Sequence, residues 1–312
     1  TRLAGGFAPC PAPAPPLFAI HTGDAVDSGM FSELLQFIGA MDALTIPWLN
    51  VVGNHDILFF GTFPGECVTG LNVLVPYVPI VDVDRFMRFH GLAGLEQDPS
   101  LPSPSARDAD HLPSTRGRAA SSTRKLRGTT YHGFDYACRP DDPKDGTGGL
   151  CTEARGYYAF DIPVAEPHEG RVRLRGVVLN TSEDAPATVN EANHSLSRGN
   201  VLPEQIRWLK EELASGGADT FFLVFDHHNL DAFEVKKEGE AIREALLHQP
   251  RVLGYFAGHT HVDAFAEHAR PRGVPLVEVI AGSTLVFPQL ARHVDVLAAP
   301  DGRIFVRVAS LR

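Results

Sequence analysis

Short apolar runs alternate with segments of helical spacing along most of this chain, and this alternation constrains its fold more than any other feature. The apolar runs have the length of strands and end at turn-forming residues, whereas apolar residues recur every three or four positions in the segments between them. Strands are expected at 17–21, 48–52, 157–162, 172–179, 221–225, 252–256 and 276–280, and helices at 31–44, 202–213 and 238–248. A hairpin turning at Asp301 and Gly302 is expected to close the chain. Strands that alternate with helices predict a layered α/β fold.

Two segments depart from this alternation. Residues 1–16 are rich in Pro, Ala and Gly and predict a linker or loop. Residues 57–155 contain frequent Pro, Gly and Ser without a long periodic segment, and they predict a long irregular insertion or cap. Within it, residues 101–130 carry six basic residues against two acidic ones, which either contact phosphate groups or form a solvated run. We therefore expect one domain over 17–312, interrupted by the insertion at 57–155.

Composition excludes several classes of partner. The 312 residues carry a formal net charge of −10, so we expect no nucleic-acid partner. No stretch approaches the roughly 18 uninterrupted apolar residues of a membrane helix, and no transmembrane segment is expected.

The chain starts at Thr1 without the features of a signal peptide, which leads us to expect a processed polypeptide or a fragment. The sequence gives no prediction of the oligomeric state.

The four cysteines allow two interpretations. Cys138 and Cys151 bracket a loop-like run and could close a disulfide, which would imply an extracytoplasmic location, secreted or periplasmic. Alternatively, all four cysteines are unpaired thiols of a cytosolic protein. We favour the first interpretation slightly. No pair of cysteines has the C-x-x-C spacing of a zinc ribbon or a redox site.

Polar clusters follow four of the predicted strands at the point where each strand ends. They lie at 23–27, 53–56, 226–228 and 258–261. Any one of them could be ordinary turn chemistry. However, ligands of open α/β sheets bind outside the carboxyl ends of the strands, so all four clusters can meet at one site. Carboxylate, amide oxygen and imidazole are ligands that suit Zn, Fe and Mn. The four clusters together therefore predict a metal site.

In this order the clusters resemble those of the calcineurin-like metallophosphoesterase superfamily, which includes purple acid phosphatases and bacterial cyclic-nucleotide phosphodiesterases. The resemblance covers 17–56 and about 156–310 of the chain. It implies a four-layer α/β/β/α sandwich of two mixed sheets. It also implies a dinuclear centre of two divalent or trivalent ions (Mn, Fe or Zn) at the edge of the paired sheets.

The resemblance assigns the metal ligands by position. Asp24 is expected to bridge the two ions, and Asn54 to ligate the second ion through its amide oxygen. His227 and His259 are expected as further ligands of the second ion, and His261 as a ligand of the first.

The remaining polar residues of the clusters receive other roles. His55 resembles the unligated catalytic histidine of the family. His228 could replace His227 as the ligand, because Asn229 stands where family members often carry proline. Asp27 and Asp56 are expected either to orient ligand imidazoles or to act as simple turn residues.

The implied function is hydrolysis of small phosphate esters, monoester or diester, by a metal-activated hydroxide. One family motif is missing: an Asp-x-His on the first strand, which supplies two further ligands of the first ion. No Asp precedes Asp24 in this sequence and no His precedes His21. Either the motif lies upstream of the given sequence or the first site has been lost, and the first site is expected to be incomplete in this chain. The alternative function is therefore a non-catalytic binding scaffold with this fold.

Overall fold

The structure of the protein is a computed structural model, and it describes residues 15–29, 31–57, 96–97, 122–126, 129–138, 154–165, 172–182, 198–233, 237–299 and 303–311. The predicted linker at 1–16 lies almost entirely outside these residues, as do most of the predicted cap at 57–155 and Cys151. The domain boundaries and the disulfide between Cys138 and Cys151 therefore stay predictions.

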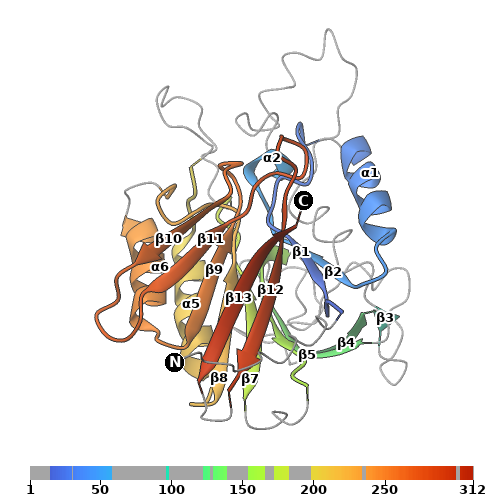
Figure 1. The fold of residues 1–312 in the computed structure, drawn as a ribbon. Coiled ribbons are helices and arrows are strands. Elements are labelled where there is room, and N and C mark those ends of the chain that lie inside the picture. Colours follow the sequence, from blue (N-terminus) through green and yellow to red (C-terminus); the bar gives the residue numbers. More distant parts are fainter. Residues whose placement is uncertain are drawn as a thin grey trace, which may run out of the picture.

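Among the described residues, nine strands form one large sheet (Figure 1). In chain order they are β3 (Glu96–Gln97), β4 (Ser122–Leu126), β5 (Thr129–Cys138), β6 (Ala154–Ile162), β7 (Arg173–Val178), β8 (Thr220–Phe225), β9 (Val252–Ala257), β10 (Ala264–His268) and β11 (Leu276–Ile280). Their spatial order is β10-β11-β9-β8-β7-β6-β5-β4-β3. The central strands β7, β8, β9 and β11 run parallel, and the others pair antiparallel. The apolar sequence of β8 suits a parallel strand that is covered on both faces.

Two helices cover one face of this sheet. They are α5 (Pro203–Ser215) and α6 (Lys237–His248). Leu209 of α5 and Leu246 of α6 are fully buried in one apolar cluster with Phe222 of β8. Pro203 occupies the first turn of α5, where the missing N–H of proline costs no hydrogen bond. The apolar stripes of the two helices thus account for this layer of the fold.

Two strand pairs cover the opposite face. The first is parallel and consists of β1 (Ala19–His21) and β2 (Trp48–Asn50); the second is the antiparallel hairpin of β12 (Ala291–Ala298) and β13 (Ile304–Leu311). Leu49 and the flanking Val51 are buried in a second apolar cluster, and Val294 and Val306 of the hairpin pack against it. Both pairs therefore share one core with the inner face of the large sheet.

Helix α1 (Phe31–Asp42) lies beside β1 and β2 (Figure 1). Its Phe37 ring lies 4.9 Å from the His21 ring and 5.8 Å from the Trp48 ring, measured between ring centroids. The layers therefore follow the order α5 and α6, the large sheet, the two strand pairs, and α1. The predicted mixed α/β class is confirmed. The finer prediction, a four-layer sandwich of two mixed sheets, is not confirmed, because the described residues of the second β layer form two separate pairs.

The prediction of irregular structure across 57–155 is wrong at β4 and β5. Tyr131 of β5 is fully buried, donates its hydroxyl hydrogen to the carbonyl oxygen of Leu17 at 2.9 Å, and contacts the rings of Phe18 and Phe160. Strand β5 forms because it pairs with β6 on one side and with β4 on the other, inside the large sheet. Such long-range pairing overrides weak local propensity.

The other predicted elements are confirmed in type. The expected helices are α1, α5 and α6, and the expected strands are β1, β2, β6, β7, β8, β9 and β11. The closing hairpin is β12–β13, with residues 300–302 of its turn outside the described set. Strand β10 was not predicted; it is an edge strand in which more and less exposed residues alternate. The turn expected after β2 is instead the four-residue helix α2 (Asn54–Ile57).

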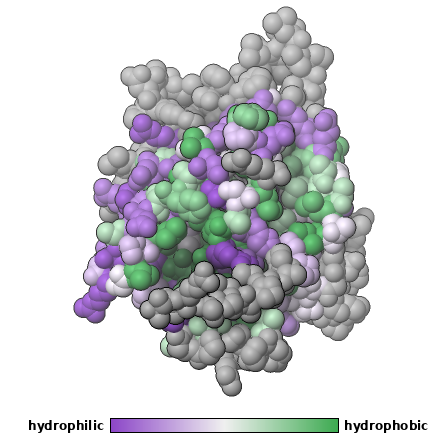
Figure 2. All heavy atoms as spheres, viewed as in Figure 1, coloured by the Kyte–Doolittle hydropathy of each residue, from purple (hydrophilic) through white to green (hydrophobic). Residues whose placement is uncertain are grey.

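The face that carries β12 and β13 shows hydrophobic residues interspersed with hydrophilic ones (Figure 2). Leu297 and Phe305 on this hairpin are each 46% exposed. In the part of the chain that the structure describes, no helix has both the length and the apolar character needed to cross a membrane.

Candidate metal centre

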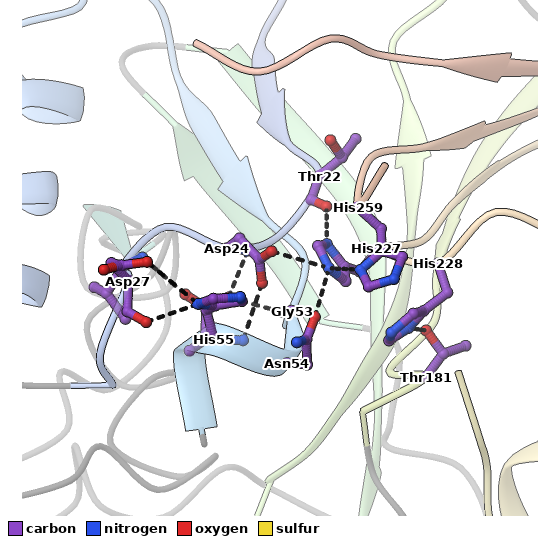
Figure 3. Close-up of polar contacts among 12 residues, drawn as sticks. Thr22, Asp24, Asp27, Gly53, Asn54, His55, Thr181, His227, His228 and His259 are labelled. Atoms are coloured by element: carbon purple, nitrogen blue, oxygen red, sulfur yellow. Dashed lines mark hydrogen bonds and ion pairs between the residues drawn. The ribbon is translucent and has the colours of Figure 1, made fainter. Parts of the chain in front are cut away.

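The four predicted clusters meet at one edge of the sheets. Asp24 follows β1 and Asn54 opens α2 just after β2, while His227 follows β8 and His259 follows β9. The strand register explains this meeting, because the parallel pairs β1–β2 and β8–β9 present their carboxyl ends on the same side. In Figure 3 the side chains of these four residues point toward one another.

The Nε2 atom of His227 is the centre of the cluster. It lies 3.0 Å from Oδ1 of Asn54, 3.1 Å from Nδ1 of His259 and 3.2 Å from Oδ2 of Asp24. The other ring nitrogen, Nδ1, lies 2.8 Å from the carbonyl oxygen of Thr22 and therefore donates its hydrogen there. In neutral His227 the Nε2 lone pair thus faces two oxygen acceptors.

These lone-pair atoms repel one another unless a positive charge lies between them. A proton on Nε2 can be shared with only one neighbouring atom, whereas a metal cation can attract the lone pairs of all four atoms at once. The contacts of 3.0–3.2 Å bring these donor atoms close enough together for one ion to be held by them. The donor set of one carboxylate, one amide oxygen and two imidazoles therefore fits a borderline divalent ion.

The pKa values of the cluster residues also indicate that the site favours a positive charge. Burial lowers the pKa of His227, but the negative charge of Asp24 outweighs this and raises it to about 9. Burial raises the pKa of Asp24, but the positive charge of His227 outweighs this and holds it well below its usual range. Burial, together with His227, lowers the pKa of His259 to about 4. Asp24 and His227 thus form an ion pair when no metal is bound.

The backbone of the loops that carry these donor residues is strained. Asp24, His259 and His261 have φ angles of 56°, 66° and 58°, in the left-handed region that non-glycine residues rarely adopt. Gly23 has a φ of 90°, and a Cβ there would clash with the ring of His227. Backbone strain of this kind typically costs about 1–3 kcal/mol and concentrates at functional sites.

Asp56 joins the two loops that carry Asp24 and Asn54. Its buried carboxylate accepts the backbone N–H groups of Gly53 at 2.7 Å, Asp24 at 3.0 Å and Val26 at 3.1 Å. Of the two roles expected for Asp56, these contacts to backbone N–H groups favour that of a turn residue over that of a group orienting a ligand imidazole. Burial, and then the charge of Asp24, raise its pKa well above the usual range.

His55 stands next to the cluster without entering it. Its backbone N–H donates to Oδ1 of Asp24 at 3.0 Å. Its Nδ1 lies 2.7 Å from the carbonyl oxygen of Asp27 and 3.4 Å from the Oδ1 atom of that residue. Asp27 thus orients the imidazole of His55, whereas its predicted role toward a ligand imidazole stays a prediction. The side chain of His55 is 30% exposed, so its ring can meet a molecule that approaches from solvent.

His228 belongs to the cluster as well. One ligand atom from each of His227, His228 and His259 lies within 4.8 Å of the others. Nδ1 of His228 lies 2.7 Å from Oγ1 of Thr181, which in turn donates to Oδ1 of Asp226 at 2.7 Å (Figure 3 shows the contact with Thr181). His261 is exposed and is not part of this histidine group.

Thr181 and Asp226 are site residues to which sequence reasoning gave no role. Thr181 lies in the polar run at 180–182, which follows β7 after Leu179, so the rule that found the other clusters also applies to it. Asp226 stands inside a recognised cluster. It is fully buried, and burial raises its pKa to about 6. His21, by contrast, lies beneath the site, with its Nδ1 3.1 Å from Oδ1 of Asn50.

Comparison with known proteins bears on the first part of the chain. Residues 7–126 match the family model of the calcineurin-like phosphoesterases, which confirms the resemblance over the segment that contains Asp24, Asn54 and His55. Among solved structures, a dimetal phosphatase from Danio rerio is similar, with a TM-score of 0.43 and 14% sequence identity. That alignment covers 88% of this chain and 74% of the other. No curated protein matches the chain.

Proposed function

Because residues 7–126 match the calcineurin-like phosphoesterases, we propose that this protein is a metal-dependent hydrolase of phosphate esters. The observation that carries the proposal is the convergence of Asp24, Asn54 and His259 on Nε2 of His227 at 3.0–3.2 Å. A divalent ion held by these donors would polarise a phosphoryl oxygen and lower the pKa of a water ligand toward neutrality.

Two hydrogen bonds orient the donor atoms of the proposed metal centre. The carboxylate of Asp24 accepts the backbone N–H of His55 at 3.0 Å, which orients it toward the cluster. Thr22 fixes the hydrogen of His227 on Nδ1, which leaves Nε2 as the donor atom toward an ion. Both contacts orient donor atoms before any ligand arrives, which reduces the cost of reorganisation.

His55 is the group that we propose acts on the reacting phosphate. Because Nδ1 donates to the carbonyl oxygen of Asp27, the proton for the leaving oxygen would be held on Nε2. A positioned general acid of this kind typically contributes about 10²–10⁴-fold to the rate. The partial exposure of His55 suits this role better than that of a buried ligand.

The finer features of the reaction rest on the family resemblance. We propose a dinuclear centre in which Asp24 lies between two ions and His261 serves the first, with phosphate monoesters or diesters as substrates. Asp24, Asn54, His227 and His259 are the four donors that we propose for the second ion. The exposed position of His261 is compatible with a ligand whose partners are contributed by other parts of the protein.

Kinetics with matched variants would test the proposal. The full chain is assayed on p-nitrophenyl phosphate and bis(p-nitrophenyl) phosphate with Zn²⁺ or Mn²⁺, together with His55→Asn and His227→Ala. His248→Ala, an exposed histidine at the end of α6, is the control. We expect metal-dependent turnover, a loss of about 10²–10⁴-fold in kcat for His55→Asn with its metal content retained, and loss of metal in His227→Ala.

Other outcomes would contradict the proposal. Tightly bound metal without hydrolysis of either ester would favour the binding scaffold instead. Full activity of His55→Asn would remove the imidazole from the reaction while leaving the metal site intact.

A further inference from the structure

The loop after β8 carries His227 and is held by two buried carboxylates. At its start, Oδ1 of Asp226 accepts the backbone N–H of His227 at 2.7 Å. Three residues farther along, Oε1 of Glu278 on β11 accepts the backbone N–H of Leu230 at 2.7 Å. Glu278 is fully buried, and a buried carboxylate is costly unless it is paired. The proposed mechanism gives Glu278 no role.

The other oxygen of Glu278 begins a chain of hydrogen bonds. Its Oε2 lies 2.7 Å from Nε2 of His268 on β10, and Nδ1 of His268 lies 3.3 Å from Nη2 of Arg243 on α6. Nη1 of Arg243 lies 3.2 Å from Oδ1 of Asp231. Because Asp231 follows Leu230, the chain begins and ends at neighbouring residues of the same loop. Helix α6 and strands β10 and β11 thus hold this part of the loop together.

The direction of each hydrogen bond in this chain is fixed. A guanidinium can only donate, so Nδ1 of His268 accepts from Arg243 and the imidazole hydrogen lies on Nε2. Nε2 of His268 therefore donates to Glu278, as does the backbone N–H of Leu230. Both side-chain positions of residue 278 must accept, which a carboxylate can do and an amide cannot. A glutamine side chain there would turn its own N–H groups toward a second donor.

Strand register connects Glu278 with the part of the loop next to the proposed metal donors. Glu278 pairs with Tyr255 of β9, whose hydroxyl lies 2.5 Å from Oδ2 of Asp226. The same hydroxyl lies 2.7 Å from the carbonyl oxygen of His228. Burial, and then the charges of Asp226 and Glu278, raise the pKa of Tyr255 well above its usual range, so the hydroxyl keeps its hydrogen. Residues of β9 and β11 therefore hold the loop backbone from 226 to 231.

We infer that Glu278 is a positioning residue of the proposed metal centre, because it holds the loop after β8 in the conformation that turns Nε2 of His227 toward the other donors. Arg243 and His268 fix the direction of its hydrogen bonds. The inference rests on the proposed function only in taking His227 as a metal ligand. Loss of a partner that orients a ligand typically lowers metal affinity by about 10–100-fold.

Zinc titration of Glu278→Gln tests the role of the carboxylate. We expect zinc affinity to fall by about 10-fold, at the low end of this range, because the four donors are unchanged. Glu212→Gln is the matched control, since Glu212 is also buried and pairs with Arg175, but lies on α5. It should lose comparable stability in urea and keep wild-type zinc affinity. Unchanged affinity in Glu278→Gln, or an equal loss in both variants, would overturn the inference.

Replacing Arg243 tests the chain of hydrogen bonds separately from stability. Without the guanidinium, His268 can carry its hydrogen on Nδ1 and accept with Nε2 from the new amide at position 278. The amide oxygen can then accept the N–H of Leu230 again. We therefore expect Glu278→Gln/Arg243→Met to bind zinc more tightly than Glu278→Gln, whereas independent losses would add. A double variant that binds zinc no more tightly than Glu278→Gln would overturn the inference.

The tautomer of His268 can be measured without metal or activity. Long-range ¹H–¹⁵N spectra of the metal-free chain should place its ring hydrogen on Nε2 in the wild type, and on Nδ1 in the double variant. A wild-type His268 with its hydrogen on Nδ1 would overturn the inference, whether or not either variant folds.

The outcomes separate this inference from the proposed function. Zinc affinity that depends on Glu278 as expected, without phosphate-ester hydrolysis, would support its positioning role while refuting the proposed function. Metal-dependent hydrolysis with zinc affinity independent of Glu278 would overturn the role of Glu278 alone. A wild-type chain that binds no zinc would refute both.

Discussion

Gly53 offers the sharpest test of how the metal centre is built. This residue lies between β2 and α2, and a Cβ added there would clash with the backbone nitrogen and Oδ1 of Asp24. Its φ is outside the left-handed region, so alanine can adopt the same backbone. Gly53→Ala therefore perturbs the site through one steric contact, without backbone strain.

The size of the effect follows from the contacts that Asp24 must lose. A shift of its carboxylate lengthens the 3.2 Å contact to His227 and the 3.0 Å hydrogen bond from the His55 backbone. Overpacking of this kind lowers the free energy of unfolding by about 1–3 kcal/mol. Misplacing one donor should weaken zinc binding by about 10–100-fold, which corresponds to about 1.4–2.8 kcal/mol of binding free energy.

Urea unfolding and zinc titration of Gly53→Ala measure the two effects. Gly39→Ala is the control, because a Cβ there meets nothing within 4 Å. Alanine inside helix α1 should instead raise the stability by about 0.5–1 kcal/mol and leave zinc affinity unchanged. Wild-type zinc affinity in Gly53→Ala would refute the reasoning, since Asp24 would then not be a donor held by the close approach of the two loops.

Three further predictions concern the metal, a buried pair and pH. Zn²⁺ at about 100 times its Kd should stabilise the fold by about 2.7 kcal/mol; a melting temperature that a chelator leaves unchanged would contradict the metal centre. Glu278 is buried and accepts both a loop N–H and the His268 ring at 2.7 Å. Glu278→Gln should therefore lower the free energy of unfolding in urea by about 1.5–3 kcal/mol, whereas Asp219→Asn, in an exposed pair, should change it by less than about 1 kcal/mol. In the metal-free protein the folded-state pKa of His227 lies above its unfolded value, at about 9. Its ion pair with Asp24 should contribute fully below pH 6.5 and be lost as pH rises through about 9; urea unfolding from pH 6 to 10 would measure this, and the same curve in Asp24→Asn would argue against it.

Much of the candidate site could be predicted because its residues lie in local sequence patterns that are recognisable on their own. Asp24, Asn54, His227 and His259 each follow an apolar strand and sit at or beside a turn. Since both features depend on a few neighbouring residues, the chain sequence is enough to find them.

The supporting contacts could not be predicted in the same way. Asp56 holds backbone N–H groups of two loops, and Thr181 reaches His228 from another strand end, 47 positions away. The strand around Tyr131 escaped prediction for a related reason: it forms by pairing with β6, and its own sequence carries little periodicity.

The sequence alone therefore determined the mixed α/β class, the order of the strand-end clusters and the type of donor that each one offers. Only the tertiary structure decided which atoms meet. The register that pairs Val178 with Phe225, and Phe225 with Phe256, sets the neighbouring loops side by side. A shift of one residue in that register would turn the side chains to opposite faces and separate the donors. Distances between loops depend on such pairings, which no single segment encodes.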